Sequence, residues 1–411
     1  MEYEVLFDRA KQAAFALKNA STESKNAALI AISQALRANV DRIEAANELD
    51  LAAAKEAGTP EGMLDRLSYK EKRILASADD LLQVVSLADP VGEVLDDRIA
   101  NAGFRLRKVR VPFGVIGIIY EARPNVTVDV AALCIKTGNA CLLKGGSNAK
   151  YTNETLAEII REAITAYLPA DAVLLMPSER SATQALITAR GKVDLLVPRG
   201  SKGLIQYVLD NAKVPVIETG AGVCHLYVDK GADFEQAINL LVNAKTQRPS
   251  VCNAVETLLV DAAVADAFLP LAIDVMRSKG VLLRGEPSLV MQYGFEPMPS
   301  TDYYTEYDAL ELSVKVVKGV CEAVEHVNKY GTGHSDCIVT KDEEAAGIFI
   351  KGVDSACVYH NVSTRFSDGG CFGFGAELGI STQKLHARGP MGLTEMTSYR
   401  YVLTGNGEVR K

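Results

Sequence analysis

The sequence predicts an α/β protein with a helical N-terminal layer, parallel β-sheets and a small β arm. Three observations carry this prediction. Short apolar runs alternate with longer runs of helical period from about residue 112 onwards, which is typical of strands joined by helices in a parallel sheet. The first 90 or so residues are rich in Ala, Leu, Glu and Lys with a helical period. Two segments, near residues 105 and 400, alternate polar with apolar side chains.

The N-terminal 90 residues are expected to pack as a layer of helices, with Ser21 and Thr22 placed to cap the long helical run that follows them. The pattern of side chains changes over residues 98–120, where alternating polar and apolar side chains are followed by an unbroken apolar run. This pattern predicts an extended hairpin arm that leads into a buried strand.

Apolar runs that read as strands then alternate with helical segments in two series. The first series comprises the runs at residues 140–144, 172–176, 193–197 and 214–218. The second series starts near residue 231 and has strand-like runs at residues 256–260, 281–285, 313–317, 337–340 and 356–360. The final stretch, from residue 396, alternates again around a Gly-Asn-Gly turn, so it is expected to pair with the arm near residue 105 or with another subunit.

Length and composition limit the possible functions. A chain of 411 residues is long enough for two or three domains, each with its own core. Its net charge of -8, without a cluster of Lys and Arg, argues against nucleic acid or an anionic membrane as a partner. No metal-type Cys/His spacing occurs, so no metal site is predicted. The start of the chain lacks the features of a signal peptide, and no apolar run is long enough to span a membrane, so a cytoplasmic location is expected.

Cys252 is the candidate nucleophile among the eight cysteines. It lies in a polar loop between a helical segment and a strand, just after Arg248, and such loops are where a rigid scaffold places reactive groups. A thiol needs a nearby cation or helix N-terminus to become a thiolate near neutral pH, and Arg248 is one candidate. The alternative is a buried structural cysteine, which is the more common fate of a free thiol.

Arg123 and Asn125 follow the buried strand that ends near residue 120 and precede a helix, so they are expected at the carboxyl edge of a parallel sheet, where ligands bind. The Asn125 amide is suited to donate to a developing oxyanion; alternatively, it caps the helix.

Five further positions carry weaker signals. Lys144 ends a strand and precedes a glycine turn, where it either meets a nucleotide or lies in solvent. Gly200 and Ser201 open a helix in PRGSKG, an arrangement that binds phosphate through backbone amides, although turn glycines alone also explain it. Arg365, in a Gly-rich loop, and Arg388, in a later turn, are candidates for binding an anionic group, or are parts of structural turns.

The motifs taken together, in their order along the chain, identify a protein family more specifically than any single motif does. The segments YEARPNVTVD, LLKGGSNA, LVPRGSKGL, VIETGAGVCHLYVD, NAKTQRPSVCNAVETLLV, YGTGHSD, STRFSDGG and GISTQKLHARGPMGL occur in this order. Together they resemble the gamma-glutamyl phosphate reductases, a family of the aldehyde dehydrogenase superfamily. The resemblance extends from the N-terminal helices to the last strand, and the chain has no room for a fused amino-acid kinase domain.

The resemblance implies a Rossmann-type parallel-sheet cofactor domain, an α/β catalytic domain and a small β oligomerisation arm. On this basis we expect residues 1–97 and 112–230 to form the dinucleotide-binding domain and residues 231–393 the catalytic domain. Residues 98–111 and 394–411 are then the arm of a homo-oligomer, a dimer or tetramer. The loops that carry the motifs are expected to gather at one edge of the sheet.

The activity implied by the resemblance is the NADPH-dependent reduction of L-glutamyl 5-phosphate to L-glutamate 5-semialdehyde with release of phosphate, the second step of proline biosynthesis from glutamate. Cys252 would form a thioester, and the Asn125 amide with the Cys252 backbone N–H would hold the oxyanion. Glutamate 5-kinase is the enzyme that would hand over the substrate.

The resemblance also implies roles for the remaining candidates. Lys144 would contact the adenosine ribose or its 2′-phosphate, Gly200 and Ser201 the pyrophosphate, and Glu306 the nicotinamide ribose. Three arginines, Arg123, Arg388 and alternatively Arg365, would bind the phosphate or the α-carboxylate of the substrate.

Some features keep other possibilities open. NAD-preferring relatives place a carboxylate where this chain has Ser147 and Asn148, which favours NADP. Cys371 stands in a loop where relatives often carry an acidic residue. Glu218 lies near the position of the water-activating glutamate of hydrolytic aldehyde dehydrogenases, so an NAD-dependent enzyme that hydrolyses its thioester is the alternative function. A catalytically silent scaffold is disfavoured because Cys252, Asn125 and Glu306 are all present.

Overall fold

The computed structural model describes residues 2–410, and the chain divides into two compact units. Unit 1 comprises residues up to 218 together with 373–379 and the segment from 391 onwards. Unit 2 comprises residues 219–372 and 380–390. None of the helices in this described part of the chain is long and apolar enough to cross a membrane.

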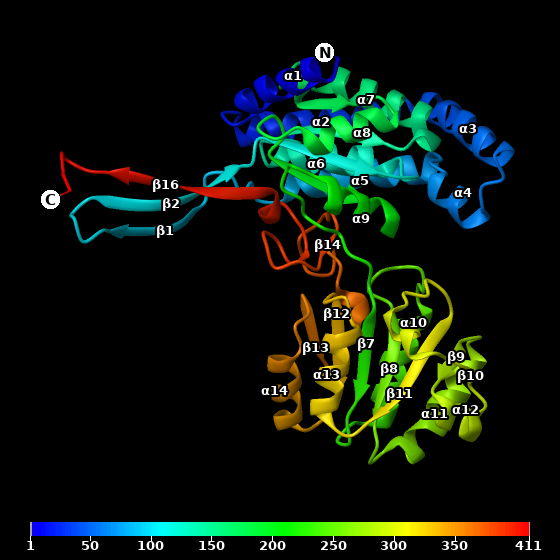
Figure 1. Cartoon of the computed structure of the whole chain (residues 1–411). Helices are drawn as coiled ribbons and strands as arrows, with labels where there is room; N and C mark the ends of the chain where they lie inside the picture. Colours follow the sequence, from blue (N-terminus) through cyan, green and yellow to red (C-terminus); the bar gives the residue numbers. More distant parts are fainter. Residues whose placement is uncertain (1, 411) are drawn as a thin grey trace. The chain divides into compact units, whose positions relative to one another are not determined.

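Unit 1 contains a four-stranded parallel sheet covered by helices (Figure 1). The strands, in the order β5-β4-β3-β6, are β3 (Val115–Tyr120), β4 (Ala140–Gly145), β5 (Val173–Leu175) and β6 (Leu195–Arg199). The helices are α1 (Glu2–Leu17), α2 (Thr22–Ala38), α3 (Val40–Glu56), α4 (Glu61–Leu67), α5 (Glu71–Ser86), α6 (Asn125–Lys136), α7 (Lys150–Ile164), α8 (Arg180–Thr188) and α9 (Lys202–Asn211), with 3₁₀ turns η1 (Ser147–Ala149), η2 (Ala170–Ala172) and η5 (Thr394–Met396). Every residue of β3 and β4 is buried, as expected for strands covered on both faces.

The arm is a three-stranded antiparallel sheet that extends away from the helices of unit 1 (Figure 1). Its strands are β1 (Val94–Ile99), β2 (Arg105–Pro112) and β16 (Thr397–Thr404), in the order β1-β2-β16. Of the two partners expected for the final stretch, the arm is therefore the one that it meets within this chain. The arm begins at residue 94 and not at 98, because β1 pairs with β2 over most of its length.

Unit 2 is built on a seven-stranded parallel sheet, in the order β10-β9-β11-β8-β7-β12-β13. Its strands are β7 (Cys224–Val228), β8 (Val255–Asp261), β9 (Leu282–Gly285), β10 (Glu296–Pro297), β11 (Glu311–Val317), β12 (Ser335–Val339) and β13 (Cys357–His360). Its helices are α10 (Phe234–Thr246), α11 (Ala265–Ser278), α12 (Pro287–Tyr293), α13 (Val320–Tyr330) and α14 (Glu343–Gly352), with 3₁₀ turns η3 (Ser300–Tyr304) and η4 (Thr364–Phe366) and a short ladder of β14 (Ile380–Ser381) with β15 (Gly389–Pro390).

Two details differ from the expected organisation. The first unit ends after Glu218 and not near residue 230, because β7 pairs with β8 and β12 inside the second sheet. The run at residues 214–218, expected as a strand, forms only an isolated bridge between Val216 and Leu196. Pro215 has no N–H to donate, so this segment cannot extend the ladder along β6.

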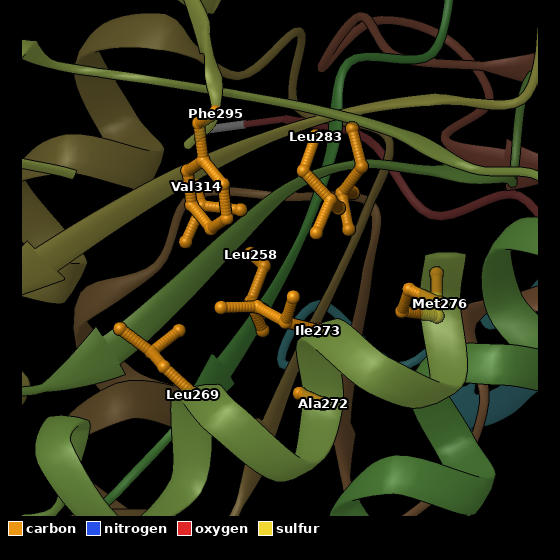
Figure 2. A pocket seen from close by; sticks show the side chains of 9 residues that line it. Leu258, Leu269, Ala272, Ile273, Met276, Leu283, Phe295 and Val314 are labelled. Atoms are coloured by element: carbon orange, nitrogen blue, oxygen red, sulfur yellow. The ribbon is translucent and has the colours of Figure 1, made fainter. Parts of the chain in front are cut away.

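The core of unit 2 contains a small apolar cavity beneath α11 (Figure 2). Its volume is about 10 Å³ and its lining includes Leu258, Ile273 and Phe295. This space holds at most about one water molecule and offers no polar group. The cavity is therefore a packing defect of the core, and the candidate site lies elsewhere.

Candidate active site

Cys252 lies on the connection between α10 and β8 and is half-buried. Among the other cysteines, five are buried and two, Cys321 and Cys371, are exposed. A half-buried thiol on a loop can be reached by a small molecule and is still shielded from bulk water. The location therefore agrees with a reactive cysteine better than with the buried structural cysteine that was the alternative.

Gly222 holds the cysteine loop in place. A Cβ atom at position 222 would lie only 1.4 Å from the carbonyl oxygen of Cys252, so no residue with a side chain fits there. The Gly222 N–H also donates to Oε1 of Glu306 at 2.8 Å. Glu306, expected at the nicotinamide ribose, is thus anchored to the residue that touches the Cys252 backbone.

Arg365 is brought to the same loop by a second set of contacts. The Asn253 side chain donates to the carbonyl oxygen of Ser367 at 2.9 Å, and the Thr364 hydroxyl donates to the carbonyl oxygen of Asn253 at 2.7 Å. These bonds fix the turn η4, which carries Arg365, against the residue after Cys252.

The charges around Arg365 show which groups it faces. Burial and the like charge of Arg248 lower the pKa of Arg365, whereas the side chains of Cys252, Asp368 and Cys371 raise it. Arg365 is therefore close enough to Cys252 to stabilise a thiolate, a role for which the sequence indicated only Arg248. Cys371 belongs to the same electrostatic neighbourhood.

Cys224 and His334, which the sequence did not single out, lie beside the cysteine loop. The Cys224 thiol donates to the carbonyl oxygen of Cys252 at 3.2 Å, and burial raises the pKa of Cys224 well above its usual value. His334 lies 3.8 Å from the Cys224 sulfur, and burial lowers its pKa to about 4, so it is neutral at physiological pH. His225 is buried against Asp336, with 2.9 Å between its Nδ1 and the carboxylate, which indicates a structural role.

A buried ion pair flanks the cysteine loop. Lys245, in the last turn of α10, lies 2.6 Å from the carboxylate of Glu256 on β8, and both side chains are fully buried. Burial raises the pKa of Glu256 to about 8, although Lys245 opposes this shift. The pair spans the ends of the two elements between which Cys252 is held.

Arg388 is engaged with protein groups. Its Nη2 donates to the backbone oxygen of Asp354 at 2.7 Å and to its carboxylate at 2.9 Å, and Lys384 pairs with the same carboxylate. The Arg388 Nε is buried without a hydrogen-bond partner. The Nη2 group of Arg388 is thus bonded to Asp354, whereas the Nε–H can still donate a hydrogen bond.

In unit 1 the candidates gather at the carboxyl edge of the sheet. Asn125 is the first residue of α6, and its amide nitrogen donates to Asp129 at 2.9 Å, one turn along the helix. Pro124 occupies the cap position and Asn125 makes no capping bond, so the alternative role of Asn125 as a helix cap is not seen. Burial raises the pKa of Asp129 to about 7. Arg123 is half-buried in the same turn.

Lys144 is buried at the end of β4, so it is not the solvent-exposed lysine of the alternative interpretation. Its ammonium donates to the carbonyl oxygens of Gly145 and Ser178 at 3.0 and 2.9 Å. Burial lowers the pKa of Lys144, whereas the carboxylates of Glu179 and Glu121 raise it. A positive charge is therefore held at this edge of the sheet.

Gly200 and Ser201 form the exposed turn between β6 and α9. Ser201 caps α9, since its hydroxyl accepts from the Leu204 N–H at 3.4 Å. The Ser201 N–H donates to the carboxylate of Glu121 at 2.9 Å, and a Cβ on Gly200 would lie 2.6 Å from the same carboxylate. Glu121 was missed at the sequence level, although it is the first charged residue after the buried strand β3.

These residues fit a dinucleotide cofactor in part. Lys144 supplies a cation, Gly200 and Ser201 supply an open helix start, and Asn148 has a buried Oδ1 without a partner, which suits a ribose hydroxyl. The Ser201 amide, however, is held by Glu121.

The two units use opposite edges of their sheets. In unit 1, Asn125, Lys144 and Ser201 follow the strands β3, β4 and β6. In unit 2, Gly222 and Cys252 precede the strands β7 and β8, so they lie at the amino edge. The expectation that the motif loops gather at one edge of the sheet therefore does not describe them, because they are divided between the carboxyl edge of one sheet and the amino edge of another.

Comparison with known sequences gives full-length relatives. The family model described as "Aldehyde dehydrogenase family" matches residues 1–282. The gamma-glutamyl phosphate reductase of Thermobifida fusca is 51% identical over 407 residues, covering 98% of this chain and 97% of the relative. The enzyme of the same name from Caldanaerobacter subterraneus is 49% identical over 416 residues and covers 100% of both chains.

Solved structures resemble the fold over the same length. The gamma-glutamyl phosphate reductase of Thermotoga maritima matches with a TM-score of 0.98 at 44% identity, covering 100% of both chains. The Saccharomyces cerevisiae enzyme of that name matches with a TM-score of 0.56 at 31% identity, covering 100% of this chain and 99% of that one. An acetylating aldehyde dehydrogenase from Geobacillus thermoglucosidasius, at 18% identity and a TM-score of 0.69, covers 100% of this chain and 98% of its own and shares the fold.

Proposed function

This chain belongs to the aldehyde dehydrogenase family and, within it, to the gamma-glutamyl phosphate reductases, and from this premise we propose how its residues carry out the reaction. The reaction is the reduction of glutamyl phosphate in proline biosynthesis with a nicotinamide cofactor. The observation that carries the proposal is the half-buried Cys252, fixed by Gly222 and by the turn that holds Arg365.

In the first step, the Cys252 thiolate attacks the carbonyl carbon of the acyl phosphate. The carbon–sulfur bond forms, the bond from carbon to the phosphate oxygen breaks, and phosphate leaves with that electron pair. Arg365 supports the step in two ways, since its charge lowers the cost of the thiolate and also faces the anionic substrate. Splitting the reduction at a thioester avoids hydride delivery to an unactivated carboxylate.

Reduction of this thioester needs a hydride, which a nicotinamide cofactor would supply when bound. The Asn125 amide and the Cys252 backbone N–H are the donors for the oxyanion that then forms at the substrate carbonyl. Collapse of the thiohemiacetal frees the aldehyde and restores the Cys252 thiolate. Asp129 leaves one amide hydrogen of Asn125 to donate, because it accepts only the other.

We assign the cofactor as NADPH and place it on unit 1. Lys144 and the turn at Gly200 and Ser201 are suited to its phosphates, and Ser147 with Asn148 carries no charge that would repel a 2′-phosphate. Glu306 is the residue of unit 2 assigned to the nicotinamide ribose. Unit 1 is accordingly the cofactor-binding domain and unit 2 the catalytic domain.

Substrate recognition falls to arginines. Arg365 has the strongest support, because its charge reaches Cys252. Arg123 is half-buried beside Asn125, and Arg388 has an unpartnered Nε, so both remain candidates for the phosphate or the α-carboxylate of the substrate. A net-acidic protein needs such paired cations to bind an anionic substrate.

The location, the oligomeric state and the source of the substrate are also proposals. We propose a cytoplasmic homo-oligomer, a dimer or tetramer, joined through the arm of β1, β2 and β16, which receives its substrate from glutamate 5-kinase. Exposed apolar side chains on the arm support the oligomer.

Replacement of Cys252 by Ala tests the covalent step. Turnover is expected to fall at least about 10³-fold, because the thioester cannot form. Cys321→Ala, which changes an exposed cysteine on α13, is the matched control and should retain full turnover.

Oxidation of the semialdehyde, assayed with and without phosphate, tests the reductase against a hydrolytic enzyme. Equal rates without phosphate would contradict the proposed reaction.

A further inference from the structure

Glu121 occupies the turn that is assigned to the cofactor phosphates. Its carboxylate accepts the Ser201 N–H at 2.9 Å at the start of α9. Gly200 makes room for it, since a Cβ there would lie 2.6 Å from the carboxylate oxygen. A carboxylate thus takes a position at a helix N-terminus where an external anion can also bind.

The backbone of Glu121 is part of the sheet, whereas its side chain bonds to the neighbouring turn. The Glu121 N–H donates to the carbonyl oxygen of Arg199 at 3.1 Å, which anchors the residue at the carboxyl edge of β3 and β6. The side chain then reaches across to the next turn. Release of the Ser201 N–H therefore calls for movement of the Glu121 side chain and not of the sheet.

The charge of Glu121 also acts on Lys144, the cation that is assigned to the cofactor. It raises the pKa of Lys144, as Glu179 does, against the lowering by burial. A phosphate that approached Lys144 and Ser201 would therefore meet the repulsion of Glu121 and would compete with it for the amide.

We propose that Glu121 is an internal substitute for a cofactor phosphate, which holds the Ser201 amide in the free enzyme and is displaced when the pyrophosphate binds. This inference rests on the proposed cofactor site. It makes Glu121 a determinant of cofactor affinity, because the free enzyme must break the Glu121 contact before the amide becomes available.

The test is the dissociation constant of NADPH for the full-length enzyme, measured by the fluorescence of the bound nicotinamide or by calorimetry. Glu121→Gln removes the charge but keeps the size of the side chain. We expect it to bind NADPH about tenfold more tightly, since a neutral amide is displaced more easily and does not repel phosphate. An unchanged or weaker affinity overturns the proposal.

Two control variants make the result specific. Glu179→Gln also removes a carboxylate that acts on Lys144 but leaves the Ser201 contact intact, so its gain should be smaller than that of Glu121→Gln. Adenosine 2′-monophosphate, which lacks the pyrophosphate, should gain much less from Glu121→Gln than NADPH does, because only the effect of Glu121 on Lys144 remains. A gain of the same size for this probe would also overturn the proposal, because the effect would not arise at the pyrophosphate.

Ser201→Pro separates this inference from the proposed cofactor site. It removes the amide hydrogen, and the φ of -63° at Ser201 is one that proline adopts. Weaker NADPH binding by this variant, with unchanged binding by Glu121→Gln, overturns only the role of Glu121. Unchanged binding by Ser201→Pro overturns the cofactor site itself.

Discussion

At the scale of single residues, the candidate site depends on close backbone contacts that leave no room for side chains. Gly222 is the clearest case, because it packs directly on the carbonyl group of Cys252. Interiors are close-packed, so an added methyl group must displace a neighbour. Here the neighbour is the backbone of the proposed nucleophile.

Gly222→Ala should therefore displace the Cys252 loop. We expect turnover to fall by about 10²-fold, since a shift of about 1 Å in a reacting group has an effect of that size. Steady-state kinetics and the melting temperature are the measurements. Gly347→Ala, in α14 with no atom within 4 Å of the added Cβ, is the matched control and should be neutral or stabilising. Full activity of Gly222→Ala would mean that the cysteine loop adapts.

Asp129 gives a prediction for pH dependence. Its pKa of about 7 is raised by burial, so between about pH 4 and pH 7 the folded protein keeps a proton that the unfolded chain has released. Stability is therefore lost as the pH rises through this range. Asp129→Asn should recover it, and the gain in unfolding free energy should be larger at pH 8 than at pH 5, by an amount on the order of 2 kcal/mol.

Urea denaturation of the parent and of Asp129→Asn at the two pH values measures this difference directly. Comparing the two proteins at each pH cancels the contribution of all other titrating groups. Asp80→Asn serves as a second variant, because Asp80 is one of the charges that raise the pKa of Asp129. A gain that is the same at both pH values would contradict the raised pKa.

At the scale of elements, α10 and β8 hold the cysteine loop between them, and the pair of Lys245 with Glu256 joins their facing ends. A buried pair adds little net stability over well-packed apolar groups, but loss of one partner leaves an uncompensated buried charge. The two single losses are not equivalent, because Glu256 takes up a proton readily, with a pKa of about 8, whereas a lysine does not lose one as easily.

Glu256→Leu should accordingly destabilise the protein by about 3–5 kcal/mol, Lys245→Met by less, and the double variant by less than Glu256→Leu alone. Unfolding free energies from denaturant titration complete the double-mutant cycle. The exposed pair of Lys341 with Asp233, also in unit 2, is the control, and its removal should cost at most about 1 kcal/mol. Additive losses at the buried pair would show that the two charges are independent.

At the scale of the whole molecule, the arm is the feature that a single chain does not explain. Tyr399, Tyr401 and Leu403 alternate along β16, so they share one face, and each is at least half exposed. Apolar side chains in a row on a protruding sheet are costly in water and are typical of an interface.

The paired change Tyr401→Asp and Leu403→Asp should therefore reduce the molecular mass in solution, measured by sedimentation or light scattering, by placing charges in the interface. Met291→Asp, an exposed apolar side chain on α12 in unit 2, is the control and should leave the mass unchanged. A parent that is already monomeric, or a variant with unchanged mass, would remove the proposed role of the arm.

Local features of this protein can be read from its sequence. Buried strands such as β3 and β4 follow from unbroken apolar runs, and the helices around them follow from period and capping, because burial pattern is a local property of the chain. The order of the motifs was enough for the family, and the loop position of Cys252 was enough to name the candidate nucleophile.

Contacts between residues that are distant in the sequence became known from the folded structure. The contact of Gly222 with Cys252 and that of Glu121 with Ser201 join segments far apart in the sequence, and their partners depend on strand order and loop packing, which no local pattern encodes. The same holds for β7, whose place in the second sheet moved the boundary to residue 218, and for the amino edge on which Cys252 lies. The periodicity of a sequence indicates whether a residue is buried. Only the close packing of the folded chain determines which residues it is buried against.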